Sequence, residues 1–369
     1  MKLGLFLMPL HYPRRPHHET YQEDLELVAY ADKLGFAETW VGEHFTLPWE
    51  NMPSPEMFIA RCLGVTGQMY FGTGVSLLHY HDPVHVAHRI AQLDHLSKGR
   101  IYFGVGSAAG PTDLEMFHLD TSKGTTRERM EESLEIILKV WKGQPFDYQG
   151  KFFHTTLPKP RPEARLGFHM YPYQKPHPPI ALAGSSPRSS TLNLVGERGW
   201  IPLSTCFLYD SYLPSHWDVV EEGAKRVARK MDRSIWRISR EMHVAKTTKQ
   251  AREEVLNGPI AKFFVDYWIP LLANLPGGIS ALKHEPSVPD SAVTPEYMLE
   301  HFWIVGDPDY VTRRVIDLHK KVGGFGTLLP LAHDWEKERK KWLDSLQLMA
   351  KEVLPAVNKA LPAKVQEMP

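Results

Sequence analysis

The chain has 369 residues, which suits one large α/β barrel or two ordinary domains, and its composition of 43% apolar and 23% charged residues is normal for a soluble globular protein. Lysine plus arginine equals aspartate plus glutamate, at 43 each, so no net charge would recruit nucleic acid, and no apolar run approaches the ~18 residues of a membrane span. Two cysteines, Cys62 and Cys206, and an opening run too short for a secretory signal give no sign of a disulfide framework, so we expect a cytoplasmic protein.

Short apolar runs alternate with stretches of helical period through the first half of the chain. This pattern predicts strands over residues 2–7, 39–41, 70–78 and 101–105. A helix is expected after each strand, and the last of them, over 126–142, places Met130, Leu134 and Ile137 on one stripe. Near-continuous apolar strands with amphipathic helices between them indicate a parallel sheet covered by helices.

The second half is less regular but continues the alternation. It predicts strands over residues 179–183, 199–204, 237–245 and 326–332. Residues 143–178 are rich in proline and aromatic side chains, and we expect an extended loop or hairpin laid over the barrel mouth. Eight strands in parallel alternation favour closure over an open sheet. The predicted fold is therefore one α/β domain over 1–369, a (β/α)8 TIM barrel with insertions at its C-terminal face.

Residues 247–298 separate the seventh strand from the last strand–helix pair, and they are too many for an ordinary connection. We expect an insertion that acts as a lid, because the run Pro276-Gly277-Gly278 can turn sharply and a set of aromatic side chains could close an apolar roof. These aromatic residues are Phe263, Phe264, Tyr267 and Trp268. An equally good interpretation is that they pack against a second copy in a dimer.

Three histidines follow predicted strands at the end where barrels carry their functional residues. His44 ends the second strand after Glu43, His11 follows the first, and His333 follows the eighth. Imidazole can move protons near neutral pH, so we take His44, His11 and His333 as candidate catalytic residues facing one cavity. For His44, its position alone fits equally well a histidine that is hydrogen-bonded to a neighbouring loop.

Ser185-Ser186-Pro187 directly follows the fifth strand and predicts the start of a helix, with Ser186 as N-cap and Pro187 in the first turn. Backbone N–H groups at such a start, with hydroxyls beside them and Gly184 allowing close approach, suit a phosphate. Taken alone, the same residues fit an ordinary cap that binds nothing even better.

Two further patterns give weaker signals. Residues 104–109 match G-x-G-x-x-A, but Gly110-Pro111 interrupts the helix that a dinucleotide site needs, so a glycine turn at Gly106-Ser107 that lies against a planar ligand fits better. Four histidines lie close together in the sequence without a matching carboxylate set at later strand ends, so we expect no metal: His79, His81, His85 and His88.

Four runs of sequence carry the most specific information, in an order and spacing that span nearly the whole chain. They are LGFAETWVGEHF around His44, LDHLSKGRIYFGVG into the fourth strand, PPIALAGSSPRS at the fifth, and GGFGTLLPLAHDW at the eighth. In these runs the chain resembles the luciferase-like flavin-dependent monooxygenases. The short runs PLHYP, YHDPVHVA and LAHDW look most like the limonene-monooxygenase branch of that family.

The resemblance carries family roles onto matching positions. It implies that His44 helps to handle the flavin–oxygen intermediate, and that Gly74-Val75 forms a non-proline cis peptide beneath the isoalloxazine ring. It also implies a turn that binds the flavin phosphate, formed by Ala183, Gly184, Ser185 and Ser186. The luciferases have an arginine where this chain has Ser107, so we expect Arg188 and helix N–H groups to meet the phosphate charge.

The function implied is that of a two-component monooxygenase. Reduced FMN, delivered by a separate NAD(P)H:flavin reductase, would react with O2 to a C4a-peroxyflavin that oxygenates a small, mainly apolar organic substrate, and a homodimer is expected. Two alternatives share the barrel: an F420-dependent oxidoreductase and a non-catalytic flavin-binding protein. A metal-dependent hydrolase is the alternative from a different class.

Overall fold

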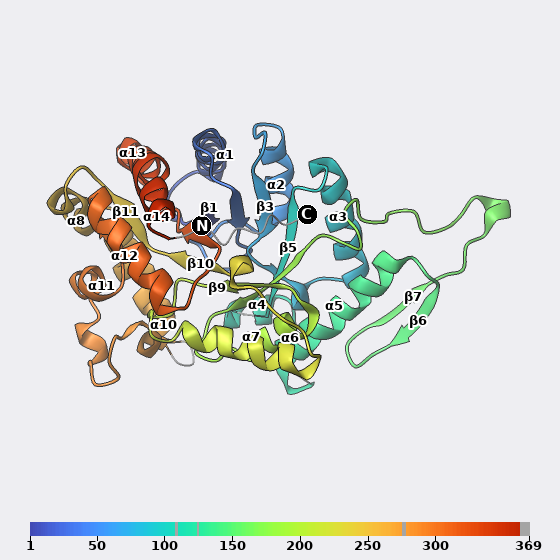
Figure 1. Ribbon diagram of the computed structural model, residues 1–369. Coiled ribbons are helices and arrows are strands. Elements are labelled where there is room, and N and C mark those ends of the chain that lie inside the picture. The colour runs from blue at the N-terminus through green and yellow to red at the C-terminus, as the bar shows by residue number, and fades with distance from the viewer. Residues whose placement is uncertain (108–109, 124, 275–277, 362–369) are drawn as a thin grey trace.

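Parallel strands form a closed barrel in the computed structural model, which describes residues 1–107, 110–123, 125–274 and 278–361 (Figure 1). The main sheet has nine strands, of which the two-residue β4 (Ser76–Leu77) only extends β3, so eight strands form the barrel wall. These are β1 (Lys2–Leu7), β2 (Glu38–Val41), β3 (Tyr70–Thr73), β5 (Ile101–Gly106), β8 (Ile180–Gly184), β9 (Ile201–Ser204), β10 (Arg237–Arg240) and β13 (Thr327–Pro330). Closure is direct, because β1 pairs with both β2 and β13. The predicted (β/α)8 barrel is confirmed.

Helices surround the barrel (Figure 1). They are α1 (His17–Leu34), α2 (Pro55–Leu63), α3 (Pro83–Ser97), α4 (Pro111–Met116), α5 (Thr126–Lys142), α6 (Leu192–Arg198), α7 (Pro214–Arg226), α12 (Pro308–Lys321), α13 (Arg339–Leu348) and α14 (Leu354–Ala360). Helix α5 shows why the sequence folds this way, since a capping box of Thr125 and Glu128 starts it and Gly143, at φ +65°, ends it. Its predicted apolar stripe is buried. None of the described helices is long and apolar enough to cross a bilayer.

Two predicted strands are interrupted in the structure. The third stops at Thr73, and a cis peptide between Gly74 and Val75 separates it from β4, which pairs with β5. The seventh continues past β10 as β11 (Met242–Val244), which leaves the barrel and pairs with β12 (Ile304–Gly306). The strand β12 was not predicted, because it has three residues and a single neighbouring strand.

The amino-terminal end of the barrel is filled with side chains. Arg237 on β10 donates two hydrogen bonds of 3.1 Å to the carboxylate of Glu38 on β2, and Trp40 donates one of 2.9 Å to the same carboxylate. The Trp40 ring occupies the interior, since a Cβ at Gly72 would lie 2.4 Å from it. The barrel is therefore a packed core at this end, which leaves the carboxyl ends of the strands for a ligand.

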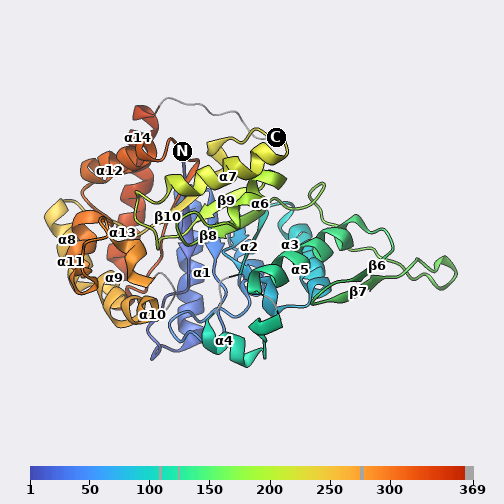
Figure 2. The ribbon, with the colours of Figure 1, turned by 90° about the horizontal axis from the view of Figure 1, so that it is seen from below.

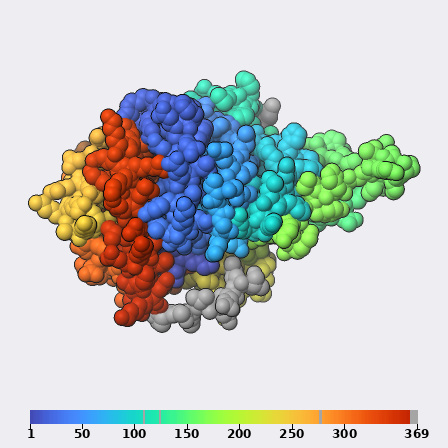
Figure 3. Space-filling view, turned by 90° about the horizontal axis from the view of Figure 1, so that it is seen from above, coloured from blue at the N-terminus to red at the C-terminus, as the bar shows by residue number. Residues whose placement is uncertain are grey.

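The segment 143–178 contains the predicted hairpin, with β6 (Phe146–Gln149) antiparallel to β7 (His154–Leu157). Its predicted place over the mouth is wrong. The Glu132 carboxylate on α5 accepts hydrogen bonds from the backbone of residues 151–153, so the hairpin lies along the outside of α5 and projects from the barrel (Figures 1 and 3). The chain then returns to the amino end, where His95 contacts the Tyr171 carbonyl at 2.8 Å.

The insertion between β11 and β12 is mainly helical. It comprises α8 (Thr248–Asn257), α9 (Pro259–Phe263), a π-helical turn over Phe264–Trp268, α10 (Ile269–Ala273) and α11 (Pro295–His301). Helices α9 and α10 lie at the same end of the barrel as α4, opposite the start of β1 (Figure 2). The predicted turn at Pro276-Gly277 lies outside the described residues. The four aromatic side chains are buried within one chain, so the interpretation that they form a dimer interface is wrong.

Candidate active site

His44 stands at the carboxyl end of β2, on a loop over residues 42–53. Its imidazole is partly exposed, and Nε2 lies 3.0 Å from Oε2 of the buried Glu50. The His44 backbone N–H donates to the Met52 carbonyl at 3.0 Å, which fixes the loop on which both residues lie. Burial by itself lowers the pKa of His44, but the negative charges of Glu50, Asp113 and Glu43 outweigh burial and raise that pKa above its ordinary value.

Glu43 ties this loop to the end of the third strand. Its buried carboxylate accepts a hydrogen bond from the Leu77 backbone N–H and contacts Nε2 of His81, both at 2.6 Å. His79 of the same histidine run is fully buried, and burial lowers its pKa to about 3. His81 is therefore paired with Glu43, and His79 is part of the packed interior. No group of three or more His, Cys, Asp or Glu within the described ranges is arranged to hold a metal ion.

An aromatic cluster lies beside His44. The ring centroids of Tyr80 and Phe117 are 4.7 Å apart and those of Phe45 and Phe117 are 4.8 Å apart. Asp113 on α4 accepts a hydrogen bond of 2.8 Å from the Thr46 backbone, which holds this helix against the His44 loop. The cluster offers a mainly apolar contact surface next to the imidazole.

The insertion supplies the opposite side of the mouth. The Trp49 ring lies against the rings of Tyr267, at 5.6 Å, and Phe263, at 5.9 Å, and Phe207 after β9 contacts Trp268 at 4.2 Å. These contacts place the π-helical turn over loops that follow β2 and β9. The insertion therefore covers part of the carboxyl end of the barrel, where the sequence predicts a lid.

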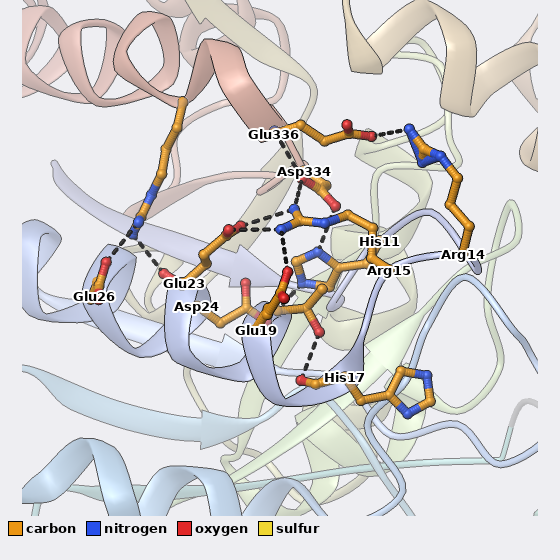
Figure 4. Close-up of polar contacts among 12 residues, drawn as sticks. His11, Arg14, Arg15, His17, Glu19, Glu23, Asp24, Glu26, Asp334 and Glu336 are labelled. Atoms are coloured by element: carbon orange, nitrogen blue, oxygen red, sulfur yellow. Dashed lines mark hydrogen bonds and ion pairs between the residues drawn. The ribbon is translucent and has the colours of Figure 1, made fainter.

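His11 and His333 both have tight partners. Nδ1 and Nε2 of His11 lie 3.0 Å from carboxylate oxygens of Asp334 and Asp24, so both nitrogens are engaged (Figure 4). Nε2 of the buried His333 lies 2.7 Å from Oε2 of Glu241. Across the described residues, no hydrogen bond or ring contact joins any two of the three imidazoles. Of the three, His44 alone keeps an exposed edge. His11 and His333 line one small cavity between α1 and the end of β13. That all three imidazoles face one cavity stays a prediction.

The predicted phosphate turn, residues 183–186, lies at the end of β8. The helix expected at Pro187 begins instead at Leu192, so Ser186 is not its N-cap. The reason is that the Ser186 carbonyl accepts hydrogen bonds from His216, at 2.9 Å, and from the Ser189 N–H, at 3.1 Å, which closes a turn first. A Cβ at Gly184 would lie 2.8 Å from the His216 ring, so glycine is needed there. The side chains of Ser185 and Ser186 are exposed.

A second cation close to this turn is Arg127, which sequence reasoning missed and which also pairs with Glu131 on the same helix at 2.8 Å. Its guanidinium hydrogen-bonds the hydroxyl of Ser190, while Thr126 beside it donates to the Ser107 carbonyl at 2.9 Å. Arg188, which was expected to meet a phosphate, is exposed and paired with Glu222 at 2.6 Å. The available signal for Arg127 was its place in the first turn of a predicted helix that follows the fourth strand.

The predicted ring-binding positions also come together. The cis peptide expected at Gly74-Val75 is present. A Cβ at Gly106 would lie 2.5 Å from Cγ2 of Val75, so the glycine allows Val75 to lie across the end of β5. Ala108 and Ala109 of the glycine turn lie outside the described residues.

Comparison with known proteins agrees with this geometry. The family model described as luciferase-like monooxygenase matches residues 1–323. The chain is 31% identical to 2,5-diketocamphane 1,2-monooxygenase 1 of Pseudomonas putida over 97% of this chain and 99% of the relative. It is 32% identical to limonene 1,2-monooxygenase of Rhodococcus erythropolis over 96% of this chain and 86% of the relative. The FMN complex of the oxygenating constituent of 3,6-diketocamphane monooxygenase from Pseudomonas putida superposes with a TM-score of 0.89 at 30% identity, over 96% of this chain and 98% of the other.

Proposed function

The chain belongs to the luciferase-like monooxygenase family, and from this premise we propose that it binds FMN at the carboxyl end of its barrel and uses O2 to oxygenate a small, mainly apolar substrate. The observation that carries the proposal is the partly exposed imidazole of His44, which lies 3.0 Å from the buried Glu50 carboxylate on a loop that Glu43 ties to the end of the third strand. FMN, when bound and reduced, supplies the electrons that activate O2.

The residues present fit FMN. The exposed hydroxyls of Ser185 and Ser186 and the guanidinium of Arg127 suit the phosphate, which binds best to hydrogen-bond donors and to a positive charge. Gly74 has no side chain and that of Val75 lies over Gly106, so the ends of β3 and β5 suit a flat ring. These positions lie on three different strand ends, as expected for a barrel enzyme.

His44 would hold and move a proton at its free nitrogen. Nε2 faces Glu50, and no described residue hydrogen-bonds Nδ1, so Nδ1 is the atom available to a reacting group. The raised pKa favours the protonated ring, which suits donation of a proton or stabilisation of a developing negative charge.

We further propose a class of substrate for the mouth of the barrel, and partners for the chain. The names of two relatives refer to diketocamphane and limonene, and the aromatic cluster of Phe45, Tyr80 and Phe117 here suits a small substrate of that kind. A separate NAD(P)H:flavin reductase would supply reduced FMN, and the chain would act as a homodimer in the cytoplasm. The insertion 247–298 would act as a lid that keeps water from the reacting atoms.

The direct test is oxygen consumption with photoreduced FMN in the presence of a panel of terpenes, ketones and aromatic heterocycles. We expect at least one substrate to yield a product that carries one atom from labelled O2. If every substrate leaves only H2O2, the proposed oxygenation fails. If the protein binds F420 and not FMN, the deazaflavin alternative takes its place.

A second prediction concerns the phosphate turn. FMN should bind at least ~10-fold more tightly than riboflavin, since one hydrogen bond to a charged group contributes about 1.5–3 kcal/mol. Arg127→Ala should remove most of that difference, whereas Arg188→Ala, which loses only its exposed pair with Glu222, should keep it. Flavin fluorescence titration of the three proteins with FMN and with riboflavin measures all six affinities. Equal affinities of the unmodified protein for FMN and riboflavin would rule out this turn as a phosphate site.

A further inference from the structure

Three side chains connect the insertion to His44. The hydroxyl of Tyr267, in the π-helical turn, donates a hydrogen bond of 2.6 Å to Oε1 of Glu50. The other oxygen of that carboxylate lies 3.0 Å from Nε2 of His44. Tyr267 is 7% exposed and Glu50 1% exposed, so this series of contacts runs from the buried interior to the partly exposed His44 ring. Tyr267 is 217 residues from Glu50 in the sequence.

We propose that Glu50 and Tyr267 are positioning residues for His44, with Glu50 holding the imidazole aimed into the mouth and Tyr267 fixing that carboxylate from the insertion. Any effect of these two residues on catalysis rests on the proposed function of His44. The contacts among Tyr267, Glu50 and His44 do not depend on that function.

The hydroxyl of Tyr267 acts on Glu50 as a hydrogen-bond donor. Burial, together with the charge of Glu50, raises the pKa of Tyr267 far above its ordinary value, so the group stays neutral and serves as a donor. Its ring is held between Trp49 at 5.6 Å and Phe263 at 5.1 Å. A donor held in this way fixes which oxygen of Glu50 is left for His44.

The loop that carries Glu50 is also held in place. The Glu50 backbone N–H donates to the Leu47 carbonyl at 2.9 Å, and Leu10 and Glu50 form a β-bridge. Asp113 on α4 binds the backbone of Thr46 at 2.8 Å. Because these contacts hold the loop at Thr46 and at Glu50, we expect a change at the Glu50 carboxylate to act on His44 without a change of the loop path.

Three carboxylates face His44, and one of them contacts it. Glu43 on the same loop is engaged by His81 and by the Leu77 N–H, and Asp113 on α4 is engaged by Thr46. Glu50 is left as the direct partner of the ring. The neutral hydroxyl of Tyr267 offsets part of the Glu50 charge, so the two residues should act on His44 in opposite directions.

Opposite shifts of the His44 pKa in the Glu50 and Tyr267 variants would distinguish a positioning role from a merely structural one. Without the Glu50 charge, burial dominates and the pKa of His44 should fall by about 1–3 pH units, the usual effect of an opposite charge at this range. Without the Tyr267 hydroxyl, more of the Glu50 charge reaches the ring, and the pKa of His44 should rise. A site that had only loosened would bring both variants toward the ordinary value of histidine, which is a fall in each case.

The experiment is an NMR titration of the His44 ring in the full-length, flavin-free protein, with the signal assigned by its loss in His44→Gln. The variants are Glu50→Gln, Tyr267→Phe and, as a control, Tyr297→Phe, which removes a hydroxyl that binds His284 at 2.7 Å elsewhere in the insertion. We expect a fall, a rise and no change, respectively. No shift in Glu50→Gln overturns the inference, and a fall or no shift in Tyr267→Phe removes Tyr267 from it.

A second measurement carries the inference to the reaction. The pH at which product per FMN oxidised is half-maximal should shift in the same direction as the His44 titration in each variant. If the His44 pKa shifts as expected in each variant but the protein oxygenates no substrate, the proposed function is refuted and the positioning contacts stand. Oxygenation whose pH profile is identical in all variants would refute the positioning role and leave the proposed function intact.

Discussion

Replacing His44 by alanine should lower the rate of oxygenation by about 10²-fold or more while FMN still binds, since general acid–base groups contribute effects of this size. His44 lies at the end of β2, whereas the residues that suit the FMN phosphate follow β8 and begin α5, so the two functions are carried by different parts of the mouth. The measurements are FMN affinity by fluorescence and product formed per FMN oxidised. O2 should still be consumed, with more of it released as H2O2.

The matched control for this substitution is His85→Ala, because His85 is an exposed residue of α3. It should leave both affinity and product yield unchanged. Undiminished product formation in His44→Ala would remove His44 from the mechanism. Loss of FMN binding in that variant would place the imidazole in the flavin site instead of the proton path.

Replacing His11 by alanine should lower the free energy of unfolding by about 3–5 kcal/mol, the usual cost of removing one partner of a buried ion pair. The imidazole lies 3.0 Å from both Asp24 on α1 and Asp334 after β13, and Arg15 also contacts Asp334, at 2.7 Å (Figure 4). Without His11, the buried Asp24 loses its cation, and Asp334 keeps its contacts with Arg15 and with the Glu336 N–H. The contacts between α1 and the end of the barrel should weaken accordingly.

The same contacts make this contribution depend on pH. Burial by itself lowers the pKa of His11, but Asp24 and Asp334 outweigh it and raise the pKa from 6.5 to about 10. Because the folded state holds this proton more tightly than the unfolded chain, the contribution is complete below pH 6.5 and is lost as the pH rises through about 10. The difference in stability between the wild type and His11→Ala should therefore shrink across that range.

Urea unfolding at several values between pH 6.5 and 10 measures this difference. The control is His17→Ala, since His17 is exposed and its side chain points away from the ion pairs (Figure 4), and it should change stability by less than about 0.5 kcal/mol. A difference between the wild type and His11→Ala that stayed constant with pH would show that His11 is neutral in the folded protein.

The amino-acid sequence alone determined the barrel and the place of His44. Alternation of apolar strands with amphipathic helices is a local pattern, and it set all eight strands because a parallel strand and its covering helix each show their own period. The position of His44 followed from the strand before it, since carboxyl ends of barrel strands meet at one mouth. The cis peptide at Gly74-Val75 was predicted by resemblance and not by any physical pattern.

Only the tertiary structure decided what each candidate residue contacts. His11 meets Asp334 across 323 residues, and Tyr267 meets Glu50 across 217, because closure of the barrel brings loops together that no local pattern relates. The turn after β8 closes on His216 before a helix begins, and the hairpin binds Glu132 on α5 in place of the mouth. Local periodicity fixes which face of an element is buried, but the partner on that face depends on how distant elements pack.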